Sequence, residues 1–179
     1  MVLIVAAVAL LLRLGGGADA TPTPAAEPLV NSVERLVAQA ETDLVLERTE
    51  RGETSWMKVW KPRDAAVHKE GEPRATERSA YAEVRLFLLP SAAAAQSALA
   101  KSVSLTPVSP SGSVEGLGDE SYVWSSYAAR GSVSIRFRRS NAMILVSAST
   151  EELASRFAFH VLAAIDERLA ETKEGVVKN

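Results

Sequence analysis

The feature that most limits what this chain can fold into is an alternation of side-chain types in several short segments. Within segment 81–89 (YAEVRLFLL), Ala, Val and Leu at the even positions alternate with Tyr, Glu, Arg and Phe at positions 81–87. Successive side chains of a β-strand point to opposite faces of its sheet, so this pattern predicts a strand with one face toward a core. Five further segments have strand patterns, at 44–48, 55–60, 121–125, 131–139 and 141–149.

Turns and helix signals organise these segments into one fold class. Arg51-Gly52-Glu53 separates the first two segments and Ser140-Asn141 separates the last two, which predicts two hairpins. We expect the Asn of the second turn to have a positive φ, which this residue type tolerates. Helical patterns are found at 28–41, at 91–104 and from Thr150 onward, with fraying expected over 171–179. Hairpins followed by helices predict an α+β fold, one antiparallel sheet of five or six strands with flanking helices.

An apolar segment near the start of the chain predicts export. Residues 2–12 (VLIVAAVALLL) match the apolar part of a signal peptide, and three glycines follow soon after Arg13. A membrane-spanning helix needs roughly 20 apolar residues, which this segment does not reach. Ala18-Asp19-Ala20 supplies the small residues that signal peptidase recognises, so we expect a signal peptide at 1–20. Because no Lys or Arg precedes the apolar run, an uncleaved helix packed in a core is the alternative.

The remainder of the chain has the length and composition of one globular domain. A Pro-rich linker at 21–28 (TPTPAAEP) leads into a predicted single α+β domain at 29–179. The net charge of −2 provides no large positive field, so a nucleic-acid partner is not expected. The chain has no cysteine, so disulfides, thiolate metal sites and a lipid-bearing cysteine are excluded. We therefore predict a periplasmic or secreted protein with no stable membrane anchor after cleavage.

The most distinctive local string is GLGDE, from Gly116 to Glu120. A GxG pair suggests dinucleotide binding, but that fingerprint needs a preceding strand, a following helix and a third glycine. Here a Ser- and Pro-rich loop precedes the string and a strand follows it. We interpret the string as a turn that needs glycine backbone angles, with Asp119 accepting hydrogen bonds from nearby amides.

A family resemblance rests on this string and its surroundings. GLGDESYVW, then SIRFRRSNAMILVS and a closing helix, resembles a pattern in exported bacterial proteins and lipoproteins of unassigned function. Some of these domains are similar to the PsbP-like fold, and the resemblance covers Tyr81 to Leu169. It implies a curved antiparallel sheet with flanking helices and an envelope location. It transfers no catalytic residue, and the missing lipobox cysteine means that it implies no lipid anchor.

The titratable residues do not form a recognisable reactive site. The two histidines, His68 and His160, are too few for a zinc site, and no nucleophile motif accompanies them. Adjacent carboxylates in a strand point to opposite faces, so Asp119-Glu120 is a poor acid–base pair. Glu151-Glu152 suits the start of a helix. We predict no catalytic residue, no metal and no cofactor.

Aromatic and cationic side chains on the predicted strands form the candidate ligand-binding surface. Rings offer contact area and arginines offer directed donors for a carboxylate or phosphate. Alternation fixes faces within a strand but not between strands, so the alternative is that the first helix covers the rings. The candidate residues are Trp56, Trp60, Arg85, Trp124 and Arg136.

These observations predict an exported, non-enzymatic binding or interaction domain of the bacterial envelope. The expected partner is a small anionic ligand or another envelope protein. Two alternatives remain open at this stage: a secreted hydrolase that uses Ser or carboxylate residues, and a purely structural envelope protein without a ligand.

Overall fold

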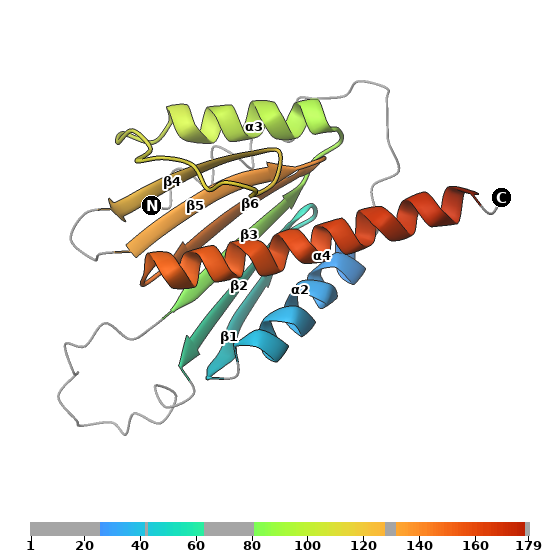
Figure 1. Cartoon of the computed structure of the whole chain (residues 1–179), viewed down its shortest axis with the longest axis horizontal. Helices are drawn as coiled ribbons and strands as arrows, with labels where there is room; N and C mark the ends of the chain where they lie inside the picture. The colour runs from blue at the N-terminus through green and yellow to red at the C-terminus, as the bar shows by residue number, and fades with distance from the viewer. Residues whose placement is uncertain (1–25, 42, 63–80, 128–131, 178–179) are drawn as a thin grey trace.

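The strand segments pair into a single open antiparallel sheet of six strands in the order β1-β2-β3-β6-β5-β4 (Figure 1). The structure is a computed structural model and describes residues 26–41, 43–62, 81–127 and 132–177. Its elements are α2 (Ala26–Ala40), β1 (Leu44–Arg51), β2 (Ser55–Pro62), β3 (Ala82–Leu88), α3 (Ala92–Ser104), β4 (Glu120–Tyr127), β5 (Ser132–Arg139), β6 (Ala142–Ala148) and α4 (Glu151–Val177). The predicted α+β class with one antiparallel sheet is confirmed.

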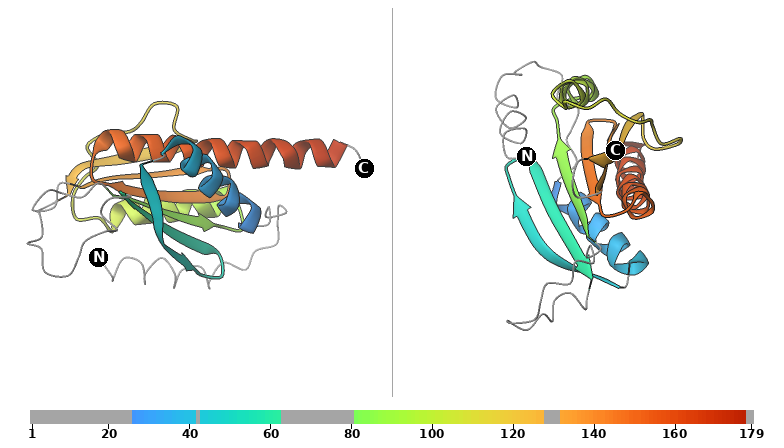
Figure 2. Two further views of the ribbon diagram at one scale, coloured as in Figure 1. Left: turned by 90° about the horizontal axis from the view of Figure 1, so that it is seen from below. Right: turned by 90° about the vertical axis from the view of Figure 1, so that its left-hand side faces the viewer.

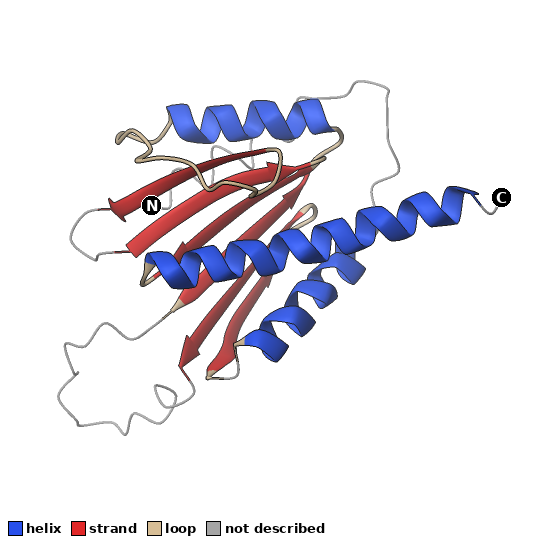
Figure 3. Cartoon of the chain, in the orientation of Figure 1, coloured by secondary structure: helices blue, strands red, loops and turns tan. Residues whose placement is uncertain are grey.

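Helices cover both sides of the sheet. Figures 2 and 3 show α4 on one side and α3 on the other, with α2 beside α4. We call the side covered by α2 and α4 the α4 face, and the opposite side the α3 face. The main core lies on the α4 face, where α2 and α4 bury their apolar side chains against strands β2 to β6, and Leu44 of β1 packs against its margin. A smaller core lies between α3 and strands β3 and β6.

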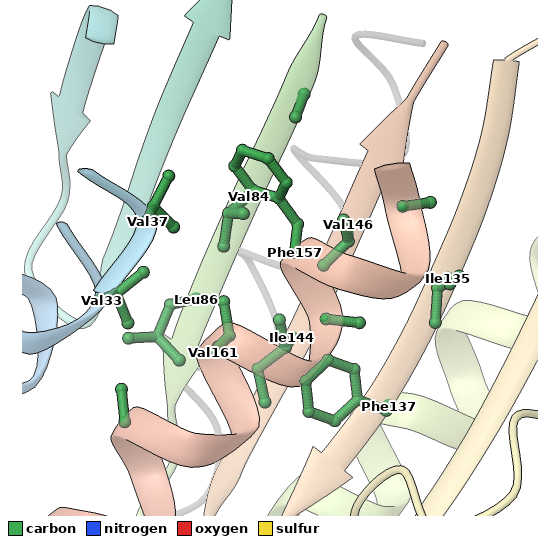
Figure 4. Close-up of a cluster of buried hydrophobic side chains, with 14 of the residues drawn as sticks. Val33, Val37, Val84, Leu86, Ile135, Phe137, Ile144, Val146, Phe157 and Val161 are labelled. Atoms are coloured by element: carbon green, nitrogen blue, oxygen red, sulfur yellow. The ribbon is translucent and has the colours of Figure 1, made fainter. Parts of the chain in front are cut away.

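The main core is built from the alternation that the sequence displays. Val84 and Leu86 of β3, Ile144 and Val146 of β6, and Ile135 and Phe137 of β5 point toward α4 (Figure 4). Side chains four residues apart on α4 pack against them, and Phe157 and Val161 of this helix are completely buried. The same face of α4 continues through Ile165 to the partly buried Leu169.

Helix α3 begins where the helical pattern at 91–104 places its start. Ser91 has an extended backbone, and its hydroxyl accepts a hydrogen bond from the Ala94 N–H at 3.1 Å. Ala95 and Leu99 are completely buried, and they pack with Phe87 and Met143 on the α3 face. The small alanine side chains allow this helix to lie close to the sheet.

Two helix boundaries and one turn angle differ from the predictions. Residues 26–28, assigned to the linker, already belong to α2, because a proline is tolerated in the first turn of a helix. Helix α4 continues to Val177 where fraying was expected, and an Arg168–Glu171 ion pair supports its last turns. In the β5–β6 turn, Ser140 and not Asn141 has the positive φ, at 53°. The leader, most of the linker and loop 63–78 lie outside the described residues.

Candidate functional site

The GLGDE turn docks against the β5–β6 hairpin. Gly118 has a φ of +69°, and a Cβ atom at this position would lie 2.3 Å from the carbonyl oxygen of Arg138. The Asp119 N–H donates to that same carbonyl at 2.8 Å. One carboxylate oxygen of Asp119 accepts the Ser140 N–H at 2.9 Å. The predicted role of Asp119 as an acceptor for nearby amides is therefore confirmed, and its partner is the residue with positive φ.

Two arginines of β5 surround the same carboxylate. Arg138 lies 3.0 Å from Asp119 and 3.3 Å from Glu120, so the two neighbouring carboxylates face one guanidinium. The expectation that they point to opposite faces is wrong, because Asp119 precedes the first residue of β4. Arg139 lies 2.9 Å from Asp119 and 2.7 Å from Asp166 of α4. The network links the turn, the hairpin and the last helix.

The network determines how Asp119 titrates. Burial alone would raise the pKa of Asp119. Hydrogen bonds from the Ser140 N–H and the Arg139 guanidinium, helped by the charges of both arginines, instead hold this pKa below its ordinary value of 3.8. A carboxyl group with a lower pKa in the folded protein stabilises the fold above its unfolded pKa. That contribution is lost as the pH falls through the folded pKa.

We therefore expect Asp119→Asn to reduce the acid sensitivity of the fold. At pH 7 the variant should be less stable than the wild type by about 1–2 kcal/mol, the usual range for a lost charge-assisted hydrogen bond. Between about pH 5 and pH 3 its urea midpoint should fall less than that of the wild type. Glu115→Gln, which removes an exposed carboxylate of the preceding turn, should keep the wild-type profile. An Asp119→Asn profile as steep as the wild type's would contradict this assignment.

The sheet separates the five residues that were predicted to form one ligand-binding surface. Trp56 and Trp60 belong to the core of the α4 face. The strand register places Arg85, Trp124 and Arg136 on the α3 face. The prediction of a single aromatic and cationic face is therefore wrong. Strand β2 buries apolar side chains on both faces, so its own pattern does not show which face the tryptophans occupy.

The two tryptophans of β2 lie beneath helices and flank a buried lysine. The exposed fractions of Trp56 and Trp60 are 6% and 3%, and the Trp60 ring meets Phe157 edge to face at 5.1 Å. Lys58, between them on the same face, forms an ion pair with Glu34 of α2. Burial lowers the pKa of Lys58. The rings are covered, as in the alternative of a helix-covered face, but the ring contact on Trp60 comes from α4, the last helix, and not from the first helix. The Lys58–Glu34 ion pair fastens α2 to the sheet.

Trp124 and Arg136 fasten the end of α3. The Arg136 Nη1 donates to the carbonyl of Ser102 at 2.5 Å and to the hydroxyl of Thr106 at 2.7 Å. Its guanidinium carbon lies 4.4 Å from the ring centre of Trp124, whose indole N–H donates to the Val108 carbonyl at 2.9 Å. Ser102 is in the last turn of α3, so the positive charge also meets the negative end of that helix.

Arg85 is the one predicted residue whose side chain stays partly accessible. It lies 2.5 Å from Glu83, and both side chains are 18% exposed. The register sets Arg85 beside Leu145, and it sets Glu83 in one row with two serines. All of these residues are half-buried on the α3 face. We call this group the Arg85 patch; its members are Glu83, Arg85, Ser134, Leu145 and Ser147.

A second polar group, which the sequence did not reveal, joins the two helices of the α4 face. Glu41, just after α2, is buried, and its Oε1 lies 3.1 Å from Arg156 and 3.4 Å from His160. Arg35 and Glu167 form a further ion pair at 3.0 Å between these helices. Because the partners are more than 100 residues apart in sequence, no local pattern identifies them.

The described residues hold no group of three or more His, Cys, Asp or Glu side chains that could bind a metal ion. His68 lies outside these residues, so the absence of a metal site stays a prediction. None of the helices described is both long and apolar enough to cross a membrane. In comparisons with known proteins, no protein-family model, no curated protein and no solved structure matches this chain.

Proposed function

We propose that the chain is an exported, non-enzymatic binding domain of the bacterial envelope and that its ligand is a small anion or an anionic segment of another envelope protein. The Arg85 patch carries this proposal. It combines a partly accessible guanidinium, two serine hydroxyls and one leucine on adjacent strands of a rigid sheet. Arginine suits planar anions such as carboxylate and phosphate, and serine hydroxyls add neutral donors.

The same patch explains how a ligand would be recognised. Glu83 already pairs with Arg85, so an incoming anion must displace that carboxylate from the guanidinium. Such competition favours ligands that offer two oxygens to the planar guanidinium, because bidentate pairs are the stronger ones. Leu145, beside Arg85, supplies apolar contact for a partly apolar ligand.

Two observations favour binding over the alternatives. The carboxylates of the GLGDE turn are held by arginines and by a backbone N–H, which suits a structural role better than a hydrolase role. The Arg85–Glu83 pair lies within one strand and, unlike Arg138 with Asp119, joins no two elements, so a ligand role accounts for it better than a purely structural one. The relationship to PsbP-like domains remains a proposal, supported by an antiparallel sheet with flanking helices.

Export is the first part of the proposal that can be tested. The apolar run at 2–12 and the Ala18-Asp19-Ala20 sequence predict cleavage after Ala20. N-terminal sequencing of the protein from its native host should therefore give Thr21 as the first residue, in an extracytoplasmic fraction. A cytoplasmic protein that keeps residues 2–12 would contradict export and favour the uncleaved helix.

Ligand binding is the second part. Amide resonances of the Arg85 patch should shift when inorganic phosphate or a short poly-glutamate peptide is titrated into the 15N-labelled protein. Arg85→Gln should raise the Kd by about tenfold or more, because it removes a charge-assisted hydrogen bond. Arg35→Gln removes an exposed arginine of α2, on the other face of the sheet, and should leave the Kd unchanged. Shifts confined to other strands, or none with either probe, would contradict this site.

A further inference from the structure

Strand β1 forms one edge of the sheet and is exposed along most of its length. It is the first strand in the sheet order, and Figure 1 shows it as the outermost strand on its side. The six residues from Leu46 to Arg51 are all exposed. An exposed edge strand presents backbone donors and acceptors to any strand that can pair with it.

The hydrogen-bond pattern of the β1–β2 hairpin shows which backbone groups face outward. The Gly52 N–H donates to the Ser55 carbonyl at 2.7 Å, and the register from there to Arg48 is continuous. Hydrogen-bonded and non-hydrogen-bonded pairs alternate along an antiparallel ladder. The N–H and C=O of Glu50 therefore point toward β2, whereas those of Thr49 point away from it toward the open edge.

The side chains of this edge are self-complementary in charge. Residues 47–51 read Glu-Arg-Thr-Glu-Arg. Glu47 is the extra residue of a bulge in β1 and forms an ion pair with Lys61 of β2, so the regular part of the edge runs from Arg48 to Arg51. If two copies pair antiparallel about Thr49, Arg48 of each copy faces Glu50 of the other, and the two Thr49 residues face each other as a hydrogen-bonded pair. Opposite charges and Thr–Thr pairs are favourable across strands.

The register of this pairing is specified by the same charges. Only alternate residues present outward backbone groups, so the smallest possible shift is two residues, which would set Arg48 opposite its own symmetry mate in one direction, or Glu50 opposite its own in the other. Like charges directly opposite each other destabilise a strand pair. Charged side chains and bulges commonly protect an edge strand from pairing. In β1 the bulge lies at Glu47, outside the paired segment, and Arg48 and Glu50 carry opposite charges in an order that matches under reversal.

We infer that β1 is a dimerisation edge, through which two copies of this chain join their sheets into one continuous sheet. The two-fold axis passes between the Thr49 residues and is perpendicular to the sheet. Arg48 and Glu50 already lie 3.2 Å apart within one copy, on side chains that are 58% and 60% exposed. In the dimer they form a four-membered cluster with their symmetry mates. The pairing leaves the Arg85 patch, on β3, β5 and β6, outside the new interface.

Sedimentation velocity on the protein purified from its native host tests the inference. The wild type should dimerise reversibly at low salt and dissociate as the salt concentration rises. Glu50→Arg and Arg48→Glu should each raise the dimer Kd by about tenfold or more, because each sets like charges opposite. An equimolar mixture of these two variants should form heterodimers, since the arginines of one then face the glutamates of the other.

Controls separate this edge from other surfaces. The double variant R48E/E50R should dimerise like the wild type, because the swap restores both pairs. Glu115→Arg makes the same charge change in the turn before β4, at the other edge, and should not alter the Kd. Thr49→Pro should give a folded monomer, as judged by circular dichroism, because the lost N–H faces the open edge. A wild type that stays monomeric at low salt, or single variants that dimerise as it does, would overturn the inference.

Discussion

Replacing Phe157 with alanine should lower the free energy of unfolding by about 3–5 kcal/mol, the range for truncating a buried phenylalanine. The Phe157 ring is fully buried where α4 crosses the sheet, and it packs edge to face against Trp60 (Figure 4). Its removal leaves a cavity among rigid strands that cannot close around it. Because a domain of this size is stable by about 5–15 kcal/mol, the urea midpoint should fall steeply.

Phe159→Ala is the matched control for this prediction. Phe159 lies two residues further along the same helix, and 42% of its surface is exposed. The substitution removes the same atoms from the same kind of backbone but opens no cavity. The free energy of unfolding should therefore change by less than about 1 kcal/mol. Similar losses for the two variants would mean that helix propensity, and not core packing, dominates at Phe157.

Replacing Gly118 with alanine should have an effect of comparable size for a different reason. Its φ of +69° lies in the left-handed region, which costs a non-glycine residue roughly 1–2 kcal/mol. In addition, the new Cβ would lie 2.3 Å from the Arg138 carbonyl oxygen, so the turn must move away from β5. Forced displacement in a packed region adds about 1–3 kcal/mol. The movement would also pull Asp119 from Ser140, so the loss should reach about 3 kcal/mol or more.

Gly116→Ala separates the two contributions. Gly116 has a similar φ of +74°, but nothing lies within 4 Å of the position of its Cβ. Its substitution should therefore cost only the conformational part, roughly 1–2 kcal/mol. The difference between the two chemical denaturation curves measures the close approach of the turn to β5. Equal losses would show that backbone angles alone account for both glycines.

Strand faces could be predicted from sequence where the two sides of a strand differ in polarity. In β3 and β5 the apolar and polar positions alternate, and their apolar sides form the core beneath α4. In β2, Trp56 and Met57 are both buried although they point to opposite faces. Only the pairing of Trp56 with Leu86 assigns the tryptophans to the α4 face.

Contacts between distant residues decided the features that the sequence did not reveal. Asn141 was the expected residue for positive φ, but its amide donates to the Leu89 carbonyl at 2.8 Å. Ser140 takes the strained angle, and its N–H meets Asp119. The Arg85 patch depends likewise on the register of β6 with β3 and β5, which no local pattern encodes. Arg85 could be identified as a candidate from the sequence, whereas the residues beside it follow only from the strand register.

The order of the strands also has a consequence for how the chain acquires its structure. Strands β1 to β3 pair with their sequence neighbours, as do β4 to β6, so each half of the sheet can form from contacts made early. The seam between β3 and β6 joins residues as distant as Glu83 and Ser147, and such non-local pairing is slow. The helix that covers this seam, α4, is the last element of the chain.

A polypeptide that leaves the ribosome in sequence order therefore has an incomplete core until α4 has been released. Before that moment, α4 does not cover the apolar sides of β3, β5 and β6. The burial of apolar surface is then too small to outweigh the conformational entropy that the chain loses on folding. Folding of this domain therefore waits for α4, whose 27 residues follow all six strands in the sequence.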